Sequence, residues 1–316
     1  MATVTTTVKS SGGNYTGIVA WNAGEQTNLV NDGNIHHCEC YAFQDTISGD
    51  GAISGWTTGA SNYIRIYAPD AERHDGTWGN GYRVYSTSGG AATFYIDSTN
   101  YLYIDGISML ITQANSYPIY EVAGGTGVFQ LSRSRIEKSG GSSTQEVLLD
   151  GNANCAVKIW NCIIVNSGSV GGDGITISLN NRVVDVYNTT IINNSIGINN
   201  SGTLTLKNVL FDDNTTDVSG SVTDTYCATD NNNTKGLSSG GAGNRFSQTF
   251  TFVGSGDYHL TVDDTGAKDY GVSDPGSGLF SDDIDGVVRT GAWDIGADEY
   301  PAAAGAAWIP RVIFID

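Results

Sequence analysis

Val186-Tyr-Asn-Thr-Thr-Ile191 is one of five segments of this chain that superimpose on one another without gaps. Each begins with an aliphatic residue, and the last three carry asparagine at the third position, at Asn161, Asn188 and Asn208. Successive segments start 27, 28, 27 and 20 residues apart. The other four segments are Ile104-Asp-Gly-Ile-Ser-Met109, Leu131-Ser-Arg-Ser-Arg-Ile136, Ile159-Trp-Asn-Cys-Ile-Ile164 and Leu206-Lys-Asn-Val-Leu-Phe211.

A period of this length, with two or three short strands in each repeat, predicts a β-solenoid. One coil is too small to bury its apolar face, whereas stacked coils bury one continuous core and pair each strand with the coils above and below. We expect Asn161, Asn188 and Asn208 to form an asparagine ladder, in which each corner amide bonds to its equivalents along the stack. A β-sandwich is the structural alternative, but it would not require asparagine to recur in register.

The segments on either side of the repeats are expected to form further strands and to cover the two ends of the stack. Tyr63-Ile-Arg-Ile-Tyr-Ala-Pro69 and Ala92-Thr-Phe-Tyr-Ile96 indicate earlier strands. Thr16 is a suitable N-cap for a short helix over 16–24, which we expect to cover one open end of the stack. The loop-rich segment after residue 220 is expected to close the other end. The predicted parts are an N-terminal cap with the first strands (1–60), the β-helix coils (61–220), an irregular C-terminal closure (221–300) and an apolar tail (301–316).

Composition excludes several classes of protein. The 316 residues include 15 basic and 33 acidic ones, a net charge of −18, so the chain repels phosphate backbones and nucleic acid is not an expected partner. No apolar run approaches the length of a membrane span, so no membrane partner is expected. The five cysteines lack the even number and regular spacing of a disulfide framework, and no secretory signal is visible. We therefore expect reduced thiols and synthesis in a cytoplasm without a signal peptide.

The C-terminal region carries a family resemblance. Its pattern consists of Asp257-Tyr-His-Leu260, Ser281-Asp-Asp-Ile-Asp-Gly286, Arg289 and Asp294-Ile-Gly-Ala-Asp-Glu-Tyr300. Together with the repeats, this ending resembles right-handed parallel β-helix proteins related in fold to pectate lyases, as found in bacteria and their phages. The resemblance covers residues 1–300 and implies an all-β fold, a right-handed parallel β-helix (β-solenoid) with a short N-terminal capping helix. Bacterial members usually carry an export signal. Because none is visible in this sequence, the phage structural type is favoured.

Polysaccharide cleavage is an activity that the resemblance suggests, and it needs grouped carboxylates. Asp212 and Asp213 form one acidic pair. The acidic residues expected to point outward from the repeat strands, Asp105, Glu137 and Asp185, share no register that would gather them on one face. The sequence therefore does not predict a coherent catalytic cluster, although cleavage at Asp212 and Asp213 stays open.

Aromatic residues offer a route to glycan binding without cleavage. Tyr101, Tyr103 and Trp160 lie on expected strands and are candidates for a sugar-stacking surface. The same alternating positions also fit stacked ladders or core residues. Loss of binding on Trp160→Ala with unchanged folding would support an adhesin.

Two acidic residues resemble the start of a calcium loop. In Asp283-Ile-Asp-Gly286, alternate carboxylates and a turn glycine make Asp283 and Asp285 candidate Ca²⁺ ligands. The motif lacks the downstream ligands of an EF-hand loop. A tight turn whose carboxylates pair with Arg289 explains the same residues, so no cofactor is predicted beyond this possible calcium site.

Zinc-type ligands occur once, near the start of the chain. His36, Cys38 and Cys40 share one face of an expected strand. A structural zinc site needs a fourth ligand, and the sequence has no second Cys/His cluster to supply it. Buried cysteines in the core are the alternative, and no metal site is predicted here.

The C-terminal tail is apolar and follows an Ala/Gly linker. It is expected either to fold back over the last coil or to dock on another chain by strand addition. The residues proposed for docking are Trp308, Ile309, Val312, Ile313, Phe314 and Ile315.

These observations favour a non-enzymatic structural protein of a phage virion surface, most simply a head decoration or a fibre component. Its expected partners are other virion proteins of the capsid or tail, with a host surface glycan as a possible further one. Because homotrimers are common among phage β-helices, we expect a homo-oligomer, most simply a trimer. The alternative is a tailspike-like polysaccharide depolymerase or a glycan-binding adhesin.

Overall fold

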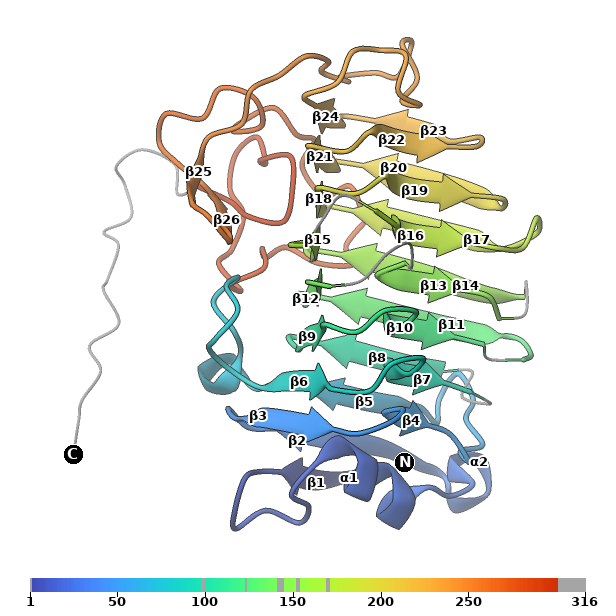
Figure 1. Ribbon diagram of the computed structural model, residues 1–316. Coiled ribbons are helices and arrows are strands. Elements are labelled where there is room, and N and C mark those ends of the chain that lie inside the picture. The colour runs from blue at the N-terminus through green and yellow to red at the C-terminus, as the bar shows by residue number, and fades with distance from the viewer. Residues whose placement is uncertain are drawn as a thin grey trace, which may run out of the picture.

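The computed structural model describes residues 2–97, 101–122, 124–140, 145–151, 154–168 and 171–300. In these residues the chain winds through three stacked parallel sheets and forms a right-handed parallel β-helix (Figure 1). Each coil visits the sheets in the same order. Every strand therefore pairs with strands of the neighbouring coils rather than with its neighbour along the chain.

We number the sheets in the order in which a coil visits them. The first sheet contains β1 (Ala2–Val8), β2 (Asn34–Cys40), β5 (Ile64–Tyr67), β8 (Tyr101–Asp105), β11 (Gly127–Ser132), β14 (Cys155–Trp160), β17 (Val183–Tyr187), β20 (Thr203–Lys207) and β23 (Thr223–Thr225). The second sheet contains β3 (Gln44–Ile47), β6 (Arg83–Ser86), β9 (Ser108–Ile111), β12 (Arg135–Lys138), β15 (Ile163–Asn166), β18 (Thr190–Ile192), β21 (Leu210–Asp212) and β24 (Ala228–Thr229). The third sheet contains β4 (Ala52–Ile53), β7 (Ala92–Ile96), β10 (Tyr117–Glu121), β13 (Val147–Leu149), β16 (Asp173–Ile177), β19 (Ile196–Asn200) and β22 (Thr216–Ser219).

The five repeated segments of the sequence pair in register with one another in the first sheet. Ile104 pairs with Leu131, Leu131 with Ile159, Ile159 with Val186, and Val186 with Leu206. These five side chains are buried in one hydrophobic core that continues through the coils. The predicted β-helix fold is therefore confirmed, because the five segments stack as the gap-free superposition requires.

A corner follows each strand of the first sheet, and its backbone explains the recurring asparagine. Asn161, Asn188 and Asn208 adopt φ angles of 51°, 39° and 55°. Gly106 and Arg133 occupy the same corner in two earlier coils, with φ of 71° and 45°. Positive φ is the left-handed region, which glycine and asparagine tolerate best.

The helix α1 (Ile18–Glu25) covers the N-terminal end of the stack, at the bottom of Figure 1. Its N-cap is Gly17 and not Thr16, and no local side chain caps it. Instead, Oδ2 of Asp45 on β3 accepts a hydrogen bond of 2.7 Å from the backbone N–H of Ile18. No helix in the described residues is long and apolar enough to cross a membrane. The other short helical elements are α2 (Leu29–Asp32) and the 3₁₀ turn η1 (Asp70–Glu72).

The coils continue past residue 220, because β23 and β24 form a further coil. The chain then returns along the outside of the second sheet (Figure 1). This returning part includes an antiparallel hairpin of β25 (Phe252–Gly254) and β26 (Asp257–Leu260).

Outward-facing apolar residues of the second sheet receive this returning chain. Ile163 and Ile192 are fully or almost fully buried against Ile284, and Leu210 against Ile295. Residues 235–245 lie over the last coil, where the carbonyl of Lys235 accepts from the backbone of Asp217 and Val218 and Leu237 is buried in the main core. The later part of the returning chain covers the side of the β-helix. The apolar side chains on this face would be exposed to water if the returning chain did not cover them.

Candidate functional site

A groove of about 510 Å³ lies between the outer face of the first sheet and residues 279–288 of the returning chain. Its lining combines aromatic, apolar and charged groups, among them Tyr63, Tyr103, Arg65, Gln130 and Val288. We call residues 279–288 the wall segment. Pockets that mix an apolar surface with a few polar groups are the usual form of small-molecule sites.

Parallel pairing places the polar and aromatic groups of the groove side by side. His37 pairs with Arg65, Arg65 with Tyr103, and Tyr103 with Gln130, so these outward side chains form one row across four coils. The ring of Tyr63 lies 4.7 Å from that of Tyr103, centroid to centroid, with an angle of 43° between the planes. All five side chains are half-buried, and those of the groove therefore keep exposed surface for a ligand.

A chain of ion pairs runs beneath this row. Asp105 accepts from Arg65 at 2.8 Å and from Arg133 at 2.5 Å, and Arg133 reaches Asp282 of the wall segment at 2.6 Å. Burial alone would raise the pKa of Asp105, but the hydrogen bonds and charges of Arg133 and Arg65 lower it. Burial would likewise lower the pKa of Arg133, but its two carboxylate partners raise it. Both groups are therefore firmly charged, and Arg133 is not available as a general base.

Aromatic packing holds the wall segment against the first sheet. Trp160 stacks on Phe280 with centroids 6.1 Å apart, and Phe280 also contacts Trp293 at 5.7 Å. Of the three predicted sugar-stacking residues, the structure brings Tyr103 and Trp160 into the groove and leaves Tyr101 outside its lining. Trp160 is only 9% exposed, so it supports the wall more than it offers a stacking face.

The three corner asparagines anchor the returning chain. Asn161 donates to the carbonyl of Asp282 at 2.7 Å, and Asn188 to that of Asp294 at 3.2 Å. Of the predicted ladder, one amide–amide link is present, from Asn208 to Asn188 at 3.2 Å. The side chains of this corner point outward, which makes them available to the wall segment and not only to one another.

A second set of asparagines, which the sequence comparison missed, lies at the next corner. The side-chain oxygen of Asn214 accepts from both the backbone and the side-chain amide of Asn194, at 3.0 and 3.2 Å. Asn231 continues the stack by donating to the carbonyl of Asn214 at 2.8 Å. Asn194 and Asn214 are separated by 20 residues, the same spacing as Asn188 and Asn208, and that shared spacing is the signal that would have found them.

Asp212 and Asp213 join Asp230 in an acidic cluster at the end of β21. Ligand-type oxygens of the three residues all lie within 4.8 Å of one another. Burial raises the pKa of Asp212 to about 7, with further contributions from Asp213 and Asp230. The cluster lies outside the lining of the groove. Asp105, Glu137 and Asp185 are not members of this cluster.

The predicted calcium residues occupy a tight turn. Oδ1 of Asp283 accepts from two backbone N–H groups of the turn, at 3.0 and 2.7 Å, and Oδ2 accepts from the backbone of Glu299 at 3.3 Å. Burial raises the pKa of Asp283 to about 7. Asp285 points instead to His259. Arg289 pairs with Glu299 at 3.1 Å and not with the turn carboxylates, so this part of the C-terminal pattern stabilises the returning chain.

His36, Cys38 and Cys40 do share one buried strand face. The Sγ atoms of Cys38 and Cys40 lie 3.7 Å apart, and burial raises the pKa of the Cys38 thiol. His36 lies 3.2 Å from the hydroxyl of Thr6 and 3.5 Å from the carboxylate of Glu25. The three residues do not form one of the compact ligand groups found in the described part of the chain. The tail residues proposed for docking lie outside the described residues.

The fold and this arrangement define the class: the protein is a right-handed parallel β-helix protein with a groove on its first sheet. No protein-family model matches the chain, and no curated protein matches it. Among solved structures, it is similar to the crystal structure of the pectate lyase Pel9A, with a TM-score of 0.33 and 13% sequence identity. That similarity covers 95% of this chain and 97% of the other.

Proposed function

We propose that this protein binds a glycan in the groove between the first sheet and the wall segment. The observation that carries the proposal is the groove itself, where the Tyr63–Tyr103 pair lies beside Arg65 and Gln130. A sugar ring has an apolar face of C–H groups and a rim of hydroxyls. Aromatic rings pack against the apolar face of the sugar, and guanidinium and amide groups hydrogen-bond to its hydroxyls.

Binding without cleavage is the activity that these groove residues support best. Asp105 and Asp282 are both held in ion pairs with Arg133, and glycoside hydrolysis needs one protonated and one ionised carboxyl group at a set separation. The low pKa of Asp105 leaves that residue unsuited to the acid role.

A glycan array followed by titration calorimetry tests the proposal. Wild-type protein should bind at least one glycan class, and Tyr103→Ala should weaken that binding about tenfold or more. Tyr120→Ala is the matched control, since Tyr120 is a half-buried tyrosine that contacts another tyrosine, Tyr95, on the third sheet. Equal affinities of both variants and wild type would contradict the proposal.

Glycan cleavage at the acidic cluster is a second candidate. A pKa of about 7 leaves Asp212 partly protonated near neutral pH beside Asp213, which is the pattern of a general acid with a neighbouring carboxylate. If cleavage occurs there, Asp212→Asn should abolish it while glycan binding in the groove persists. Incubation of wild type and variant with the bound glycan, followed by analysis of fragment length, distinguishes the two candidates.

We propose the virion surface as the place where such binding is used, on the basis of the sequence resemblance to the phage structural type. Quantitative mass spectrometry of purified virions tests this by counting copies of the chain. A count comparable with the main shell protein would support a head decoration, and a few copies per particle would support a fibre or spike. Absence from the particle would contradict a virion role.

A further inference from the structure

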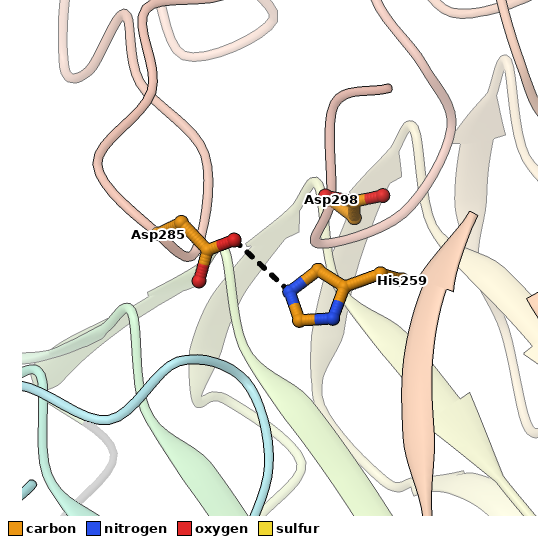
Figure 2. A group of neighbouring side chains, drawn as sticks. All are labelled: His259, Asp285 and Asp298. Atoms are coloured by element: carbon orange, nitrogen blue, oxygen red, sulfur yellow. Dashed lines mark ion pairs between the residues drawn. The ribbon is translucent and has the colours of Figure 1, made fainter. Parts of the chain in front are cut away.

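One group of side chains outside the groove contains both a histidine and carboxylates. Figure 2 shows His259 of β26 beside Asp285 of the tight turn and Asp298 near the end of the described chain. One ligand-type atom from each residue lies within 4.8 Å of the other two. The distance from Nε2 of His259 to Oδ2 of Asp285 is 3.0 Å. Two ligands at about 2.0 Å from one tetrahedral ion are separated by a similar distance.

The other ring nitrogen of His259 is already oriented. Oδ1 of Asp257 lies 2.5 Å from Nδ1, so Nε2 is the atom directed at Asp285. A carboxylate on the second nitrogen is the usual support of a histidine that ligates a metal. Nε2 is itself shielded from solvent and makes no hydrogen bond of good geometry in the described part of the chain, although it is in ionic contact with Asp285.

The charges around His259 are unbalanced. Asp257, Asp285 and Asp298 face one imidazole, and Asp298 is only 7% exposed. Arg289, whose charge also acts on Asp298, is already bound to Glu299 and to backbone carbonyls, and Arg135, which reaches the backbone of Gly256, is paired with Glu137. A divalent cation would balance these three carboxylates more fully than one protonated imidazole does.

We propose that His259, Asp285 and Asp298 bind a divalent transition-metal ion, with Zn²⁺ as its best representative. Imidazole nitrogen with carboxylate oxygen suits zinc, whereas calcium and magnesium prefer all-oxygen sites. Asp257 is the positioning residue. Because the ligands come from β26, the tight turn and the last described segment, the ion would fasten the hairpin to the wall segment of the groove.

Titration of ZnCl₂ into the untagged full chain, stripped with chelator and dialysed, tests the proposal. Calorimetry should show one saturable site for wild type. Asp285→Asn, at a partly exposed position, should weaken zinc binding at least tenfold while the circular dichroism spectrum stays unchanged. Asp257→Asn should weaken it by about 10- to 100-fold, as expected for a positioning carboxylate.

Two control variants separate this site from other acidic groups. Asp263→Asn changes an exposed carboxylate outside the cluster, and Asp213→Asn disables the acidic cluster at β21; neither should alter the affinity. With Co²⁺ in place of zinc, the d–d absorption should appear in wild type and be lost in His259→Gln. A folded wild type that binds no zinc, or zinc affinity that is unchanged in Asp285→Asn, would overturn the proposal and leave an ion-pair cluster only.

Discussion

Asp212 shows how the environment of one residue sets its chemistry. Its folded pKa of about 7 lies above the ordinary value of 3.8, because the carboxyl group is buried among Asp213 and Asp230. A raised carboxyl pKa contributes stability at low pH. That contribution is complete below about pH 4 and is lost as the pH rises through 7.

We therefore expect Asp212→Asn to stabilise the protein at pH 8 and to leave it nearly unchanged at pH 4. Each unit of pKa difference corresponds to about 1.4 kcal/mol, so the gain at pH 8 should exceed about 1 kcal/mol even after screening by solvent. Urea unfolding at both pH values, in chelator, measures it. Asp263→Asn is the control at an exposed acidic position. A variant less stable than wild type at pH 8 would contradict the assigned pKa.

At the scale of elements, the sequence predicted the strands better than the corners. The strand repeat was visible because inward positions such as Ile159 and Val186 must be apolar in every coil. The corner was partly visible, since positive φ selects asparagine at Asn161. Arg133 breaks the pattern at the same corner, and its contact with Asp282 spans 149 residues of sequence. Local patterns carry no signal for such a pair.

The second asparagine stack should stabilise the coils that it joins. Asn214→Ala removes the acceptor of two Asn194 hydrogen bonds inside the β-helix, which leaves buried donors unpaired. We expect a loss of about 2–3 kcal/mol in the free energy of unfolding. Chemical denaturation of the variant and of Asn233→Ala, an exposed control, measures the difference. Equal losses in both would show that the stack contributes nothing.

The capping helix depends on a residue from another element. Asp45 caps Ile18 at 2.7 Å and also accepts from the hydroxyl of Tyr82 at 2.8 Å. Asp45→Ala should lower the unfolding free energy by about 1–3 kcal/mol, whereas Thr16→Ala should change it little, because Thr16 is not the N-cap. Thermal melts of both variants give the comparison. A larger loss with Thr16→Ala would contradict this assignment of the cap.

At the scale of the molecule, the groove exists because the chain returns along the side of the β-helix (Figure 1). Its floor comes from four coils, and its wall from residues more than 100 positions later. The C-terminal pattern was recognisable in sequence, but its position against the second sheet was not. Arg289 illustrates why: its contacts include Asn161 from the coils and Glu299 from the returning chain.

Oligomeric state is also a property of the whole molecule. We predict a homotrimer, from the resemblance to phage β-helix proteins. Light scattering on the full chain after size-exclusion chromatography should give about three times the 33.2 kDa of one chain. A single-chain mass over the accessible concentration range would contradict this prediction.

Hydrogen–deuterium exchange in the presence of a glycan identified on the array tests the central proposal most directly, because it reports where the ligand lies. Glycan binding should slow exchange in β5, β8, β11 and the wall segment, and should leave the third sheet unchanged. Protection near the acidic cluster at β21 or over the third sheet, with none in the groove, would contradict the assignment of the groove as the glycan site.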